Sequence, residues 1–269
     1  MPIQPYKIYR IIKITLLIYA LIGIALYYLQ EKFIFHPTPM AAKDSFHFTQ
    51  KFEEVRLPIN DDDTLSVVKF FTDDTLKKGV VLYYHGNRGN ITRYASFVKP
   101  FTDNGYDVWM EDYPSFGKSV GVLTEQKLYS QALQVKKMAD AQFKTEQIII
   151  YGKSLGTSIA AYVASESPAQ QLILETPYYS MQSLFKRYAF IYPTSLMCKY
   201  KLPTYTFLSA VKYPVTIFHG TNDGVIPYSN ALKLKNVFKT NDTFITIDGA
   251  DHQNINIQPS YYSALKKLL

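Results

Sequence analysis

The sequence predicts an α/β domain with a mostly parallel central sheet and helices on both faces. The chain has 269 residues, of which 47% are apolar, so it is long and apolar enough to bury a sizeable core. Short β-branched and apolar runs, bounded by turn residues, alternate along the chain with helical stretches. Because such an alternation requires right-handed crossovers, it predicts parallel strands.

The first 36 residues are expected to form a membrane anchor that precedes this domain. Residues 14–29 are apolar apart from Thr15 and three tyrosines. With Ile11, Ile12 and Lys13 the segment reaches roughly 19 residues, close to the ~20 that a spanning helix needs. The sequence therefore predicts a single transmembrane helix, followed by one domain over residues 37–269.

The charges beside the apolar segment predict its orientation. Lys7, Arg10 and Lys13 precede it, whereas Lys32 only balances Glu31 after it. By the positive-inside rule, the N-terminus stays in the cytoplasm and the domain lies on the non-cytoplasmic side. A cleaved signal peptide and a soluble or re-entrant helix are the alternatives, but no small-x-small cleavage site follows the segment.

The remaining elements are expected in a regular order. Strands are predicted at 53–59, 65–71, 80–84, 106–110, 148–150, 171–174, 215–219 and 244–247. Helices are predicted at 92–104, 125–142, 157–164, 229–238 and from about 258. Residues 176–222 differ, because they contain no Asp or Glu and are rich in aromatic residues and proline. A short helical cap, inserted at about 177–212, is the interpretation.

A strand, a glycine-flanked serine and a helix follow one another at residues 148–164. The β-branched run Ile148-Ile149-Ile150 precedes Gly152-Lys153-Ser154-Leu155-Gly156, and a small, apolar helical stretch follows. G-x-S-x-G between a strand and a helix is the nucleophile elbow, a turn that lifts the serine hydroxyl clear of the sheet. The turn also places the Leu155 N–H at a helix start, where it can stabilise an oxyanion.

Serine is a weak nucleophile at neutral pH, so Ser154 needs a base and an acid that orients the base. His252 lies in a loop just after the late strand 244–247, and Asp223 lies in a loop after strand 215–219. The chain order Ser154, Asp223, His252 fits a catalytic triad at the carboxyl ends of parallel strands. Glu175, at the end of its own strand, is the alternative acid.

Four segments together resemble the α/β-hydrolase superfamily, over nearly the whole chain after residue 50: H-G-N-R-G-N, G-K-S-L-G, H-G-T-N-D-G-V-I-P and G-A-D-H. The apolar N-terminus and short cap are similar to its single-span, membrane-anchored serine hydrolase branch. The resemblance implies an α/β-hydrolase fold, with Ser154 as nucleophile, His252 as base and Asp223 as acid. It also implies that the Asn87 backbone N–H joins that of Leu155 in the oxyanion hole.

Other polar residues near these motifs have simpler interpretations. His85 and His219 each precede glycine at a strand end, where buried hydrogen-bonding histidines are common. Lys153 is expected to be exposed beside the nucleophile, with a role in binding substrate charge as the alternative. No spacing of His and carboxylates predicts a metal site, and the single Cys198 excludes a Cys-based zinc site. No cofactor is expected.

The net charge of +7 favours a membrane surface over nucleic acid, because no nucleic-acid motif or dense basic run is present. Five basic residues and many aromatic residues in the cap suit a lipid interface, although a solvated face is the alternative. The prediction is a membrane-anchored serine hydrolase that cleaves carboxylic esters of a small-molecule or lipid-like acyl substrate, with thioesters next. A peptidase or amidase of the same fold and a non-catalytic scaffold are the alternatives.

Overall fold

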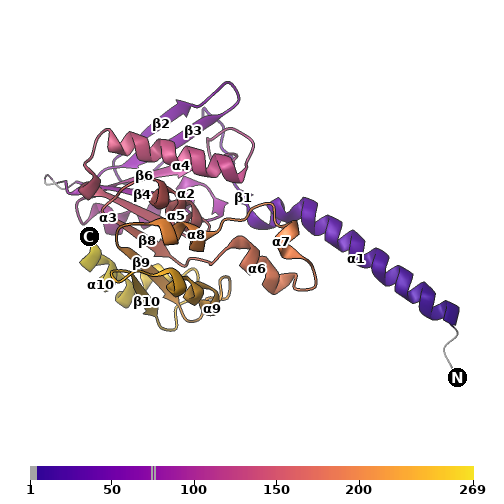
Figure 1. Ribbon diagram of the computed structural model, residues 1–269. Helices are drawn as coiled ribbons and strands as arrows, with labels where there is room; N and C mark the ends of the chain where they lie inside the picture. Colours follow the sequence, from indigo (N-terminus) through magenta and orange to yellow (C-terminus); the bar gives the residue numbers. More distant parts are fainter. Residues whose placement is uncertain (1–4, 74, 76) are drawn as a thin grey trace.

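The computed structural model describes residues 5–73, 75 and 77–269. One long helix projects from a rounded α/β body, with the N-terminus at its far end (Figure 1). Residues 1–4 of the predicted anchor lie outside the described residues. The domain that follows has the mixed α/β order that the sequence predicts.

An eight-stranded sheet forms the centre of the body, in the order β10-β9-β8-β7-β4-β6-β3-β2. Only β2–β3 and β3–β6 pair antiparallel in it, so the prediction of a mostly parallel sheet is confirmed. A separate pair joins β1 (His36–Pro37) to β5 (Arg88–Gly89). The strands of the large sheet are β2 (Phe52–Pro58), β3 (Thr64–Phe70), β4 (Gly79–Tyr84), β6 (Tyr106–Asp112), β7 (Ile148–Lys153), β8 (Gln171–Glu175), β9 (Val215–Gly220) and β10 (Thr243–Ile247).

Helices cover both faces of this sheet, and two apolar clusters fill the space between. One cluster holds α4 (Glu125–Asp140), α5 (Gly156–Glu166) and α8 (Thr204–Ala210) against the strands. The other holds α2 (Ile91–Tyr94), α3 (Lys99–Thr102) and α10 (Pro259–Leu268) against the opposite face. Successive β4 side chains divide between them, with Leu82 in the first cluster and Tyr83 in the second.

Two of the predicted helices are interrupted in the structure. The helix expected at 92–104 is divided into α2, a 3-10 turn at Ala95–Phe97 and α3. Pro100 explains the division, because it has no N–H to donate to the preceding turn and is tolerated only where a helix begins. The helix expected at 229–238 is α9 (Tyr228–Leu232), followed by a 3-10 turn at Lys233–Val237.

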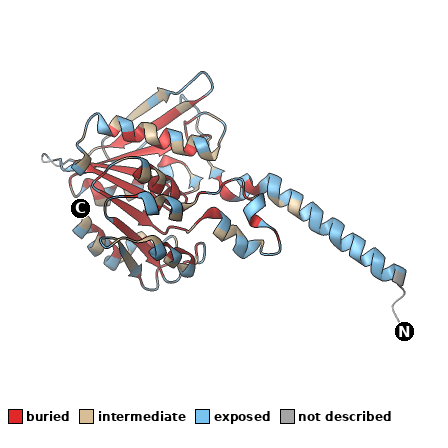
Figure 2. Ribbon diagram, viewed as in Figure 1, coloured by how far each residue is buried: buried red, intermediate tan, exposed pale blue. Residues whose placement is uncertain are grey.

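The N-terminal helix α1 runs from Pro5 to Ile34 and is longer than its apolar segment. It is long and apolar enough to cross a membrane, and most of its side chains are exposed (Figure 2). A signal sequence near the N-terminus would meet the same criteria of length and composition. The helix continues through Gln30, Glu31 and Lys32 because these residues are good helix formers, and it ends before Pro37.

The segment between β8 and β9 contains α6 (Met181–Tyr188), α7 (Thr194–Met197) and α8. α8 packs against α5 and so belongs to the layer that covers the sheet. α6, α7 and the loops around them lie instead beside the C-terminal half of α1 (Figure 1). We call residues 177–203 the cap.

One buried carboxyl in the sheet predicts a pH-dependent stability. Glu111 is 1% exposed, and burial, with the neighbouring Asp112, raises its pKa well above the ordinary value. Its carboxyl is neutral in the folded protein but ionises on unfolding. The free energy of unfolding therefore falls as the pH rises above the ordinary pKa of a glutamate, by up to about 1.4 kcal/mol per pH unit. Glu111→Gln should therefore raise the melting temperature at pH 8 more than at pH 5. The exposed Glu146→Gln is the control, and an equal effect of Glu111→Gln at both values would contradict the assignment.

Candidate active site

Ser154 lies in a strained turn between β7 and α5. Its φ is +52°, in the left-handed region that few residues other than glycine adopt. The Ser154 N–H donates to the Glu175 carbonyl at 2.9 Å, and the Thr157 N–H donates to the Ser154 carbonyl at 3.0 Å. Hydrogen bonds on both sides therefore hold the turn, and strain of this kind is common at functional sites.

The two glycines of the motif are required by close packing. A Cβ at Gly152 would meet the backbone of Gly156 and Thr157, and a Cβ at Gly156 would overlap the backbone carbonyl of Tyr84. Neither backbone can move without breaking the sheet or the helix. The sequence G-K-S-L-G thus fits this turn for a steric reason.

The structure brings Ser154, His252 and Asp223 together from three separate loops. His252 Nε2 lies 2.9 Å from Ser154 Oγ, and His252 Nδ1 lies 2.7 Å from Asp223 Oδ2. An ionised carboxylate only accepts hydrogen bonds, so Nδ1 carries the proton and Nε2 is left to accept the proton of Ser154. This is the geometry of a nucleophile, a base and an orienting acid.

The Asp223 carboxylate is held on both of its oxygens. Oδ1 accepts the backbone N–H groups of Val225 at 2.9 Å and Ile226 at 2.7 Å, while Oδ2 faces His252. Burial opposes ionisation, but the hydrogen bond and the charge of His252, with the N–H of Ile226, lower the pKa of Asp223 below its ordinary value. Asp223 is therefore a carboxylate at neutral pH, as an orienting acid must be.

Two backbone N–H groups beside Ser154 have no acceptor within the described part of the chain: those of Leu155 and Asn87. Leu155 precedes the first turn of α5, and Asn87 follows β4. The side-chain amide of Asn87 donates to the Ile34 carbonyl at 2.5 Å, and the Asn87 carbonyl accepts the His36 N–H at 2.9 Å. The loop that carries Asn87 is thereby attached to the end of α1.

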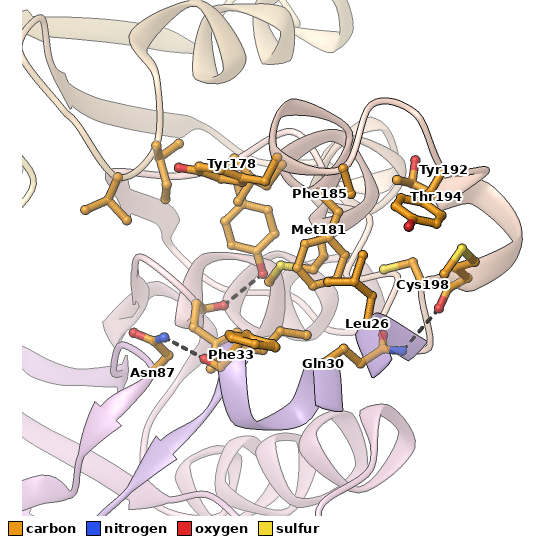
Figure 3. Close-up of a pocket in the computed structure, with 18 of the residues that line it drawn as sticks. Leu26, Gln30, Phe33, Asn87, Tyr178, Met181, Phe185, Tyr192, Thr194 and Cys198 are labelled. Carbon is orange, nitrogen blue, oxygen red and sulfur yellow. Dashed lines mark hydrogen bonds between the residues drawn. The ribbon is translucent and has the colours of Figure 1, made fainter. Parts of the chain in front are cut away.

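A cavity of about 470 Å³ lies over Ser154, between α1 and the cap. Side chains from the two elements face one another across it (Figure 3). Its lining is mostly apolar, and none of the described lining side chains is charged. The residues are Leu26, Gln30, Phe33, Ile34, Asn87, Ser154, Leu155, Tyr178, Met181, Leu184, Phe185, Tyr188, Ala189, Tyr192, Thr194, Met197, Cys198, Val225 and Ile226.

Sequence reasoning missed the part that α1 plays in this cavity. It treated the first 36 residues as an anchor apart from the domain, whereas Leu26, Gln30 and Phe33 form one wall of the cavity. The polar Gln30 next to the apolar segment was the available signal. It is 4% exposed, and its amide donates to the carbonyls of Tyr27 and Met197.

Glu175, the alternative acid, lies in a different network. Its carboxylate bonds to the Lys153 ammonium and to the hydroxyls of Tyr151 and Tyr261. The expectation that Lys153 is exposed is wrong, because Lys153 is only 7% exposed. A buried ammonium requires a buried counter-charge, and Glu175 at the end of the neighbouring strand supplies it.

Breaking the buried ion pair of Lys153 and Glu175 is expected to destabilise the protein strongly. Lys153→Met or Glu175→Gln should each lower the free energy of unfolding by about 3 kcal/mol, because each leaves one group buried without its partner. The double variant should recover most of the loss, as thermal unfolding of all three proteins would show. Lys99→Met, which removes an exposed pair with Asp103, should leave the melting temperature nearly unchanged. Additive losses in the double variant would contradict this account.

The two other candidate histidines, His85 and His219, are fully buried at strand ends, and His219 Nε2 lies 3.7 Å from Asp223 Oδ2. Nδ1 of His85 bonds to the Gly86 carbonyl at 2.7 Å, and Nδ1 of His219 bonds to the Gly220 carbonyl at 3.0 Å. Burial lowers the pKa of His219. Among the described residues, no cluster of three His, Cys, Asp or Glu side chains is placed to hold a metal ion.

Comparisons with known proteins agree with this fold. Residues 75–206 match the sequence model of a family described as serine aminopeptidase, S33, a range that includes Ser154 but ends before Asp223 and His252. The α/β hydrolase domain-containing protein aho-3 of Caenorhabditis elegans is 27% identical over 70% of this chain and 57% of its own length. The human α/β hydrolase domain-containing protein 17B is 28% identical over 71% of this chain and 66% of its own length.

Both curated relatives therefore extend beyond the region that they share with this chain, which spans less than two thirds of either. Among solved structures, an esterase of Pyrococcus furiosus superposes with a TM-score of 0.67 and 17% identity, over 88% of this chain and 97% of the esterase. A likeness at that identity shows the fold. The sheet, the strained serine turn and the superposed esterase show an α/β-hydrolase fold, and the family model and the curated relatives support the α/β-hydrolase superfamily.

Proposed function

We propose that this protein is a serine hydrolase that cleaves carboxylic esters through an acyl-enzyme on Ser154. The observation that carries the proposal is the position of His252, whose two ring nitrogens lie 2.9 Å from Ser154 Oγ and 2.7 Å from Asp223 Oδ2. A serine so placed beside an oriented imidazole is an activated nucleophile.

In the proposed reaction, Ser154 Oγ attacks the acyl carbonyl carbon while its proton passes to His252 Nε2. The backbone N–H groups of Leu155 and Asn87 stabilise the oxyanion, and Asp223 stabilises the imidazolium. The C–O bond to the alcohol then breaks as Nε2 returns the proton to the leaving oxygen. A water molecule, deprotonated by His252, attacks the acyl-enzyme and releases the acid and Ser154.

The lining of the cavity supports an acyl ester over an aminoacyl substrate. An aminopeptidase must bind the ammonium group of its substrate, and an ammonium in an apolar cavity requires a counter-charge. No described residue that lines this cavity carries one. An acyl chain needs only apolar contact, so esters come first, thioesters second and amides third.

We further propose that α1 anchors the protein in a membrane and that the domain lies on the non-cytoplasmic side. The length and exposure of α1 support the anchor, and Lys7, Arg10 and Lys13 before its apolar segment support the orientation. Protease added outside spheroplasts should digest the domain. Protection of the domain until the membrane is broken would reverse the orientation.

Rates of hydrolysis by the purified full-length protein test the chemistry. Butyrate esters, long-chain acyl thioesters and aminoacyl amides should be cleaved in decreasing order of kcat/KM. Cleavage of amides as fast as esters would favour the peptidase that the family description suggests. A folded protein that hydrolyses none of them and ignores a fluorophosphonate would favour the scaffold alternative.

A further inference from the structure

The cap does not stop at the base of α1 but lies along the helix. The rings of Tyr19 and Tyr192 stack at 4.5 Å, and the hydroxyl of each donates to backbone on the other side, to the carbonyls of Ile191 and Tyr19. Further along α1, Gln30 donates to the Met197 carbonyl at 3.1 Å. The contacts therefore cover about 11 residues of α1, or roughly 16 Å of its length.

Tyrosines and lysines mark two levels on α1. Lys199 of the cap lies over the rings of Tyr27 and Tyr28, at 4.9 and 5.5 Å, and Lys13 lies over Tyr9 at 4.4 Å. Tyr9 and Tyr28 are about 19 residues apart, or roughly 28 Å along the helix. Aromatic rings and basic side chains gather at membrane interfaces, and the hydrocarbon layer between them is about 30 Å thick.

If α1 spans the bilayer between these levels, part of the cap lies inside it. Tyr19 is nine residues from Tyr28, which places the Tyr19–Tyr192 contact about 13 Å below the interface. The two residues that precede Tyr192 in the sequence have exposed side chains: Phe190 is 76% exposed and Ile191 is 59% exposed. Exposed apolar side chains that continue an apolar helix suit lipid better than water.

The cavity lies alongside α1 as the cap does. Ser154 lies on one side of it, while Leu26, Tyr192 and Met197 line the part beside α1. Leu26 precedes the Tyr27–Tyr28 level and is therefore on the hydrocarbon side of it. An acyl chain drawn from the bilayer would meet apolar side chains from the hydrocarbon up to the nucleophile.

We propose that residues 188–197 are immersed in the bilayer alongside α1, and that the substrate is a long-chain acyl ester resident in the same membrane. Its chain enters the cavity between α1 and the cap from the hydrocarbon, and its carbonyl meets Ser154. The choice of substrate rests on the proposed hydrolase function, whereas the immersion of the cap rests on the proposed membrane anchor alone.

Tryptophan placed on the cap measures the immersion. The full-length Phe190→Trp and Leu196→Trp proteins are reconstituted in phosphatidylcholine vesicles brominated either deep in the acyl chains or near the headgroups. Tyr262→Trp, on α10 away from α1, is the matched control, and Trp109 is 2% exposed within the sheet. Deep bromine should quench Phe190→Trp at least twofold more than Tyr262→Trp, and Leu196→Trp should respond more to shallow bromine. Equal quenching at positions 190 and 262 would overturn the immersion.

A charge on the cap tests the route of the substrate. Neither Phe190 nor Leu196 lines the cavity, so Phe190→Glu and Leu196→Glu should leave kcat/KM for soluble p-nitrophenyl butyrate unchanged. Hydrolysis of p-nitrophenyl palmitate embedded in vesicles should fall about tenfold or more, because a carboxylate resists entry into hydrocarbon. If hydrolysis of both esters fell equally, or if hydrolysis of neither fell, the proposed route would be wrong. If the unsubstituted protein were not labelled by a fluorophosphonate, the hydrolase function would be refuted. The quenching result would still test the immersion of the cap.

Discussion

Alanine in place of Ser154 or His252 should lower kcat/KM for p-nitrophenyl butyrate by about five orders of magnitude. The two side chains act as a unit, because the hydroxyl is unreactive without a base and the base has no proton to take without the hydroxyl. The 2.9 Å separation of Nε2 and Oγ places them in direct contact before any substrate binds.

Stopped assays with the purified variants measure this loss, and two matched variants control for it. Ser165→Ala removes a hydroxyl from the same helix that follows Ser154, and His47→Ala removes an exposed imidazole. Both should retain nearly full activity. Retention of more than about a hundredth of the activity by His252→Ala would show that another group takes the proton of Ser154.

Asparagine in place of Asp223 should lower kcat by about three to four orders of magnitude. The amide keeps the shape of the carboxylate but turns a donor toward His252, which favours the tautomer with the proton on Nε2. That proton then faces Ser154 Oγ, and the imidazole no longer accepts from it. The fold should survive, because the amide of Asp223→Asn keeps one oxygen for the N–H groups of the following turn.

Removal of Glu175, the alternative acid, is the control for Asp223→Asn. Glu175→Gln, combined with Lys153→Met so that no unpaired cation stays buried, should cost less than about tenfold in kcat. Pre-steady-state assays of both proteins at equal concentrations of folded enzyme measure the difference. A larger loss of kcat on substitution of Glu175 than on substitution of Asp223 would assign the role of the acid to Glu175, at the end of β8.

The sequence was sufficient for the parts of this site that depend on local chemistry. Gly152 and Gly156 around Ser154 predict the turn, because no larger residue fits there. The strand order along the chain predicts that loops holding Asp223 and His252 open at the same edge of the sheet as Ser154. Pro100, too, was a readable signal for the interruption of the helix expected at 92–104.

The rest depends on contacts between distant segments that no local pattern encodes. Lys153 was expected to be exposed beside the nucleophile, and only its pairing with Glu175 from another strand allows its burial. The cavity wall arises where Leu26 and Phe33 of α1 meet a cap some 160 residues later in the chain. Periodicity predicts the helix, but not the face that it turns toward its partner.

Labelling with a fluorophosphonate, followed by mass spectrometry of the digested protein, tests the central claim most directly. The reagent forms a stable adduct only with a serine that a neighbouring base activates. A single adduct on Ser154 is expected, formed by the folded protein and lost after denaturation or in His252→Ala. An adduct on a different serine, or a folded protein in which Ser154 stays unlabelled, would contradict it.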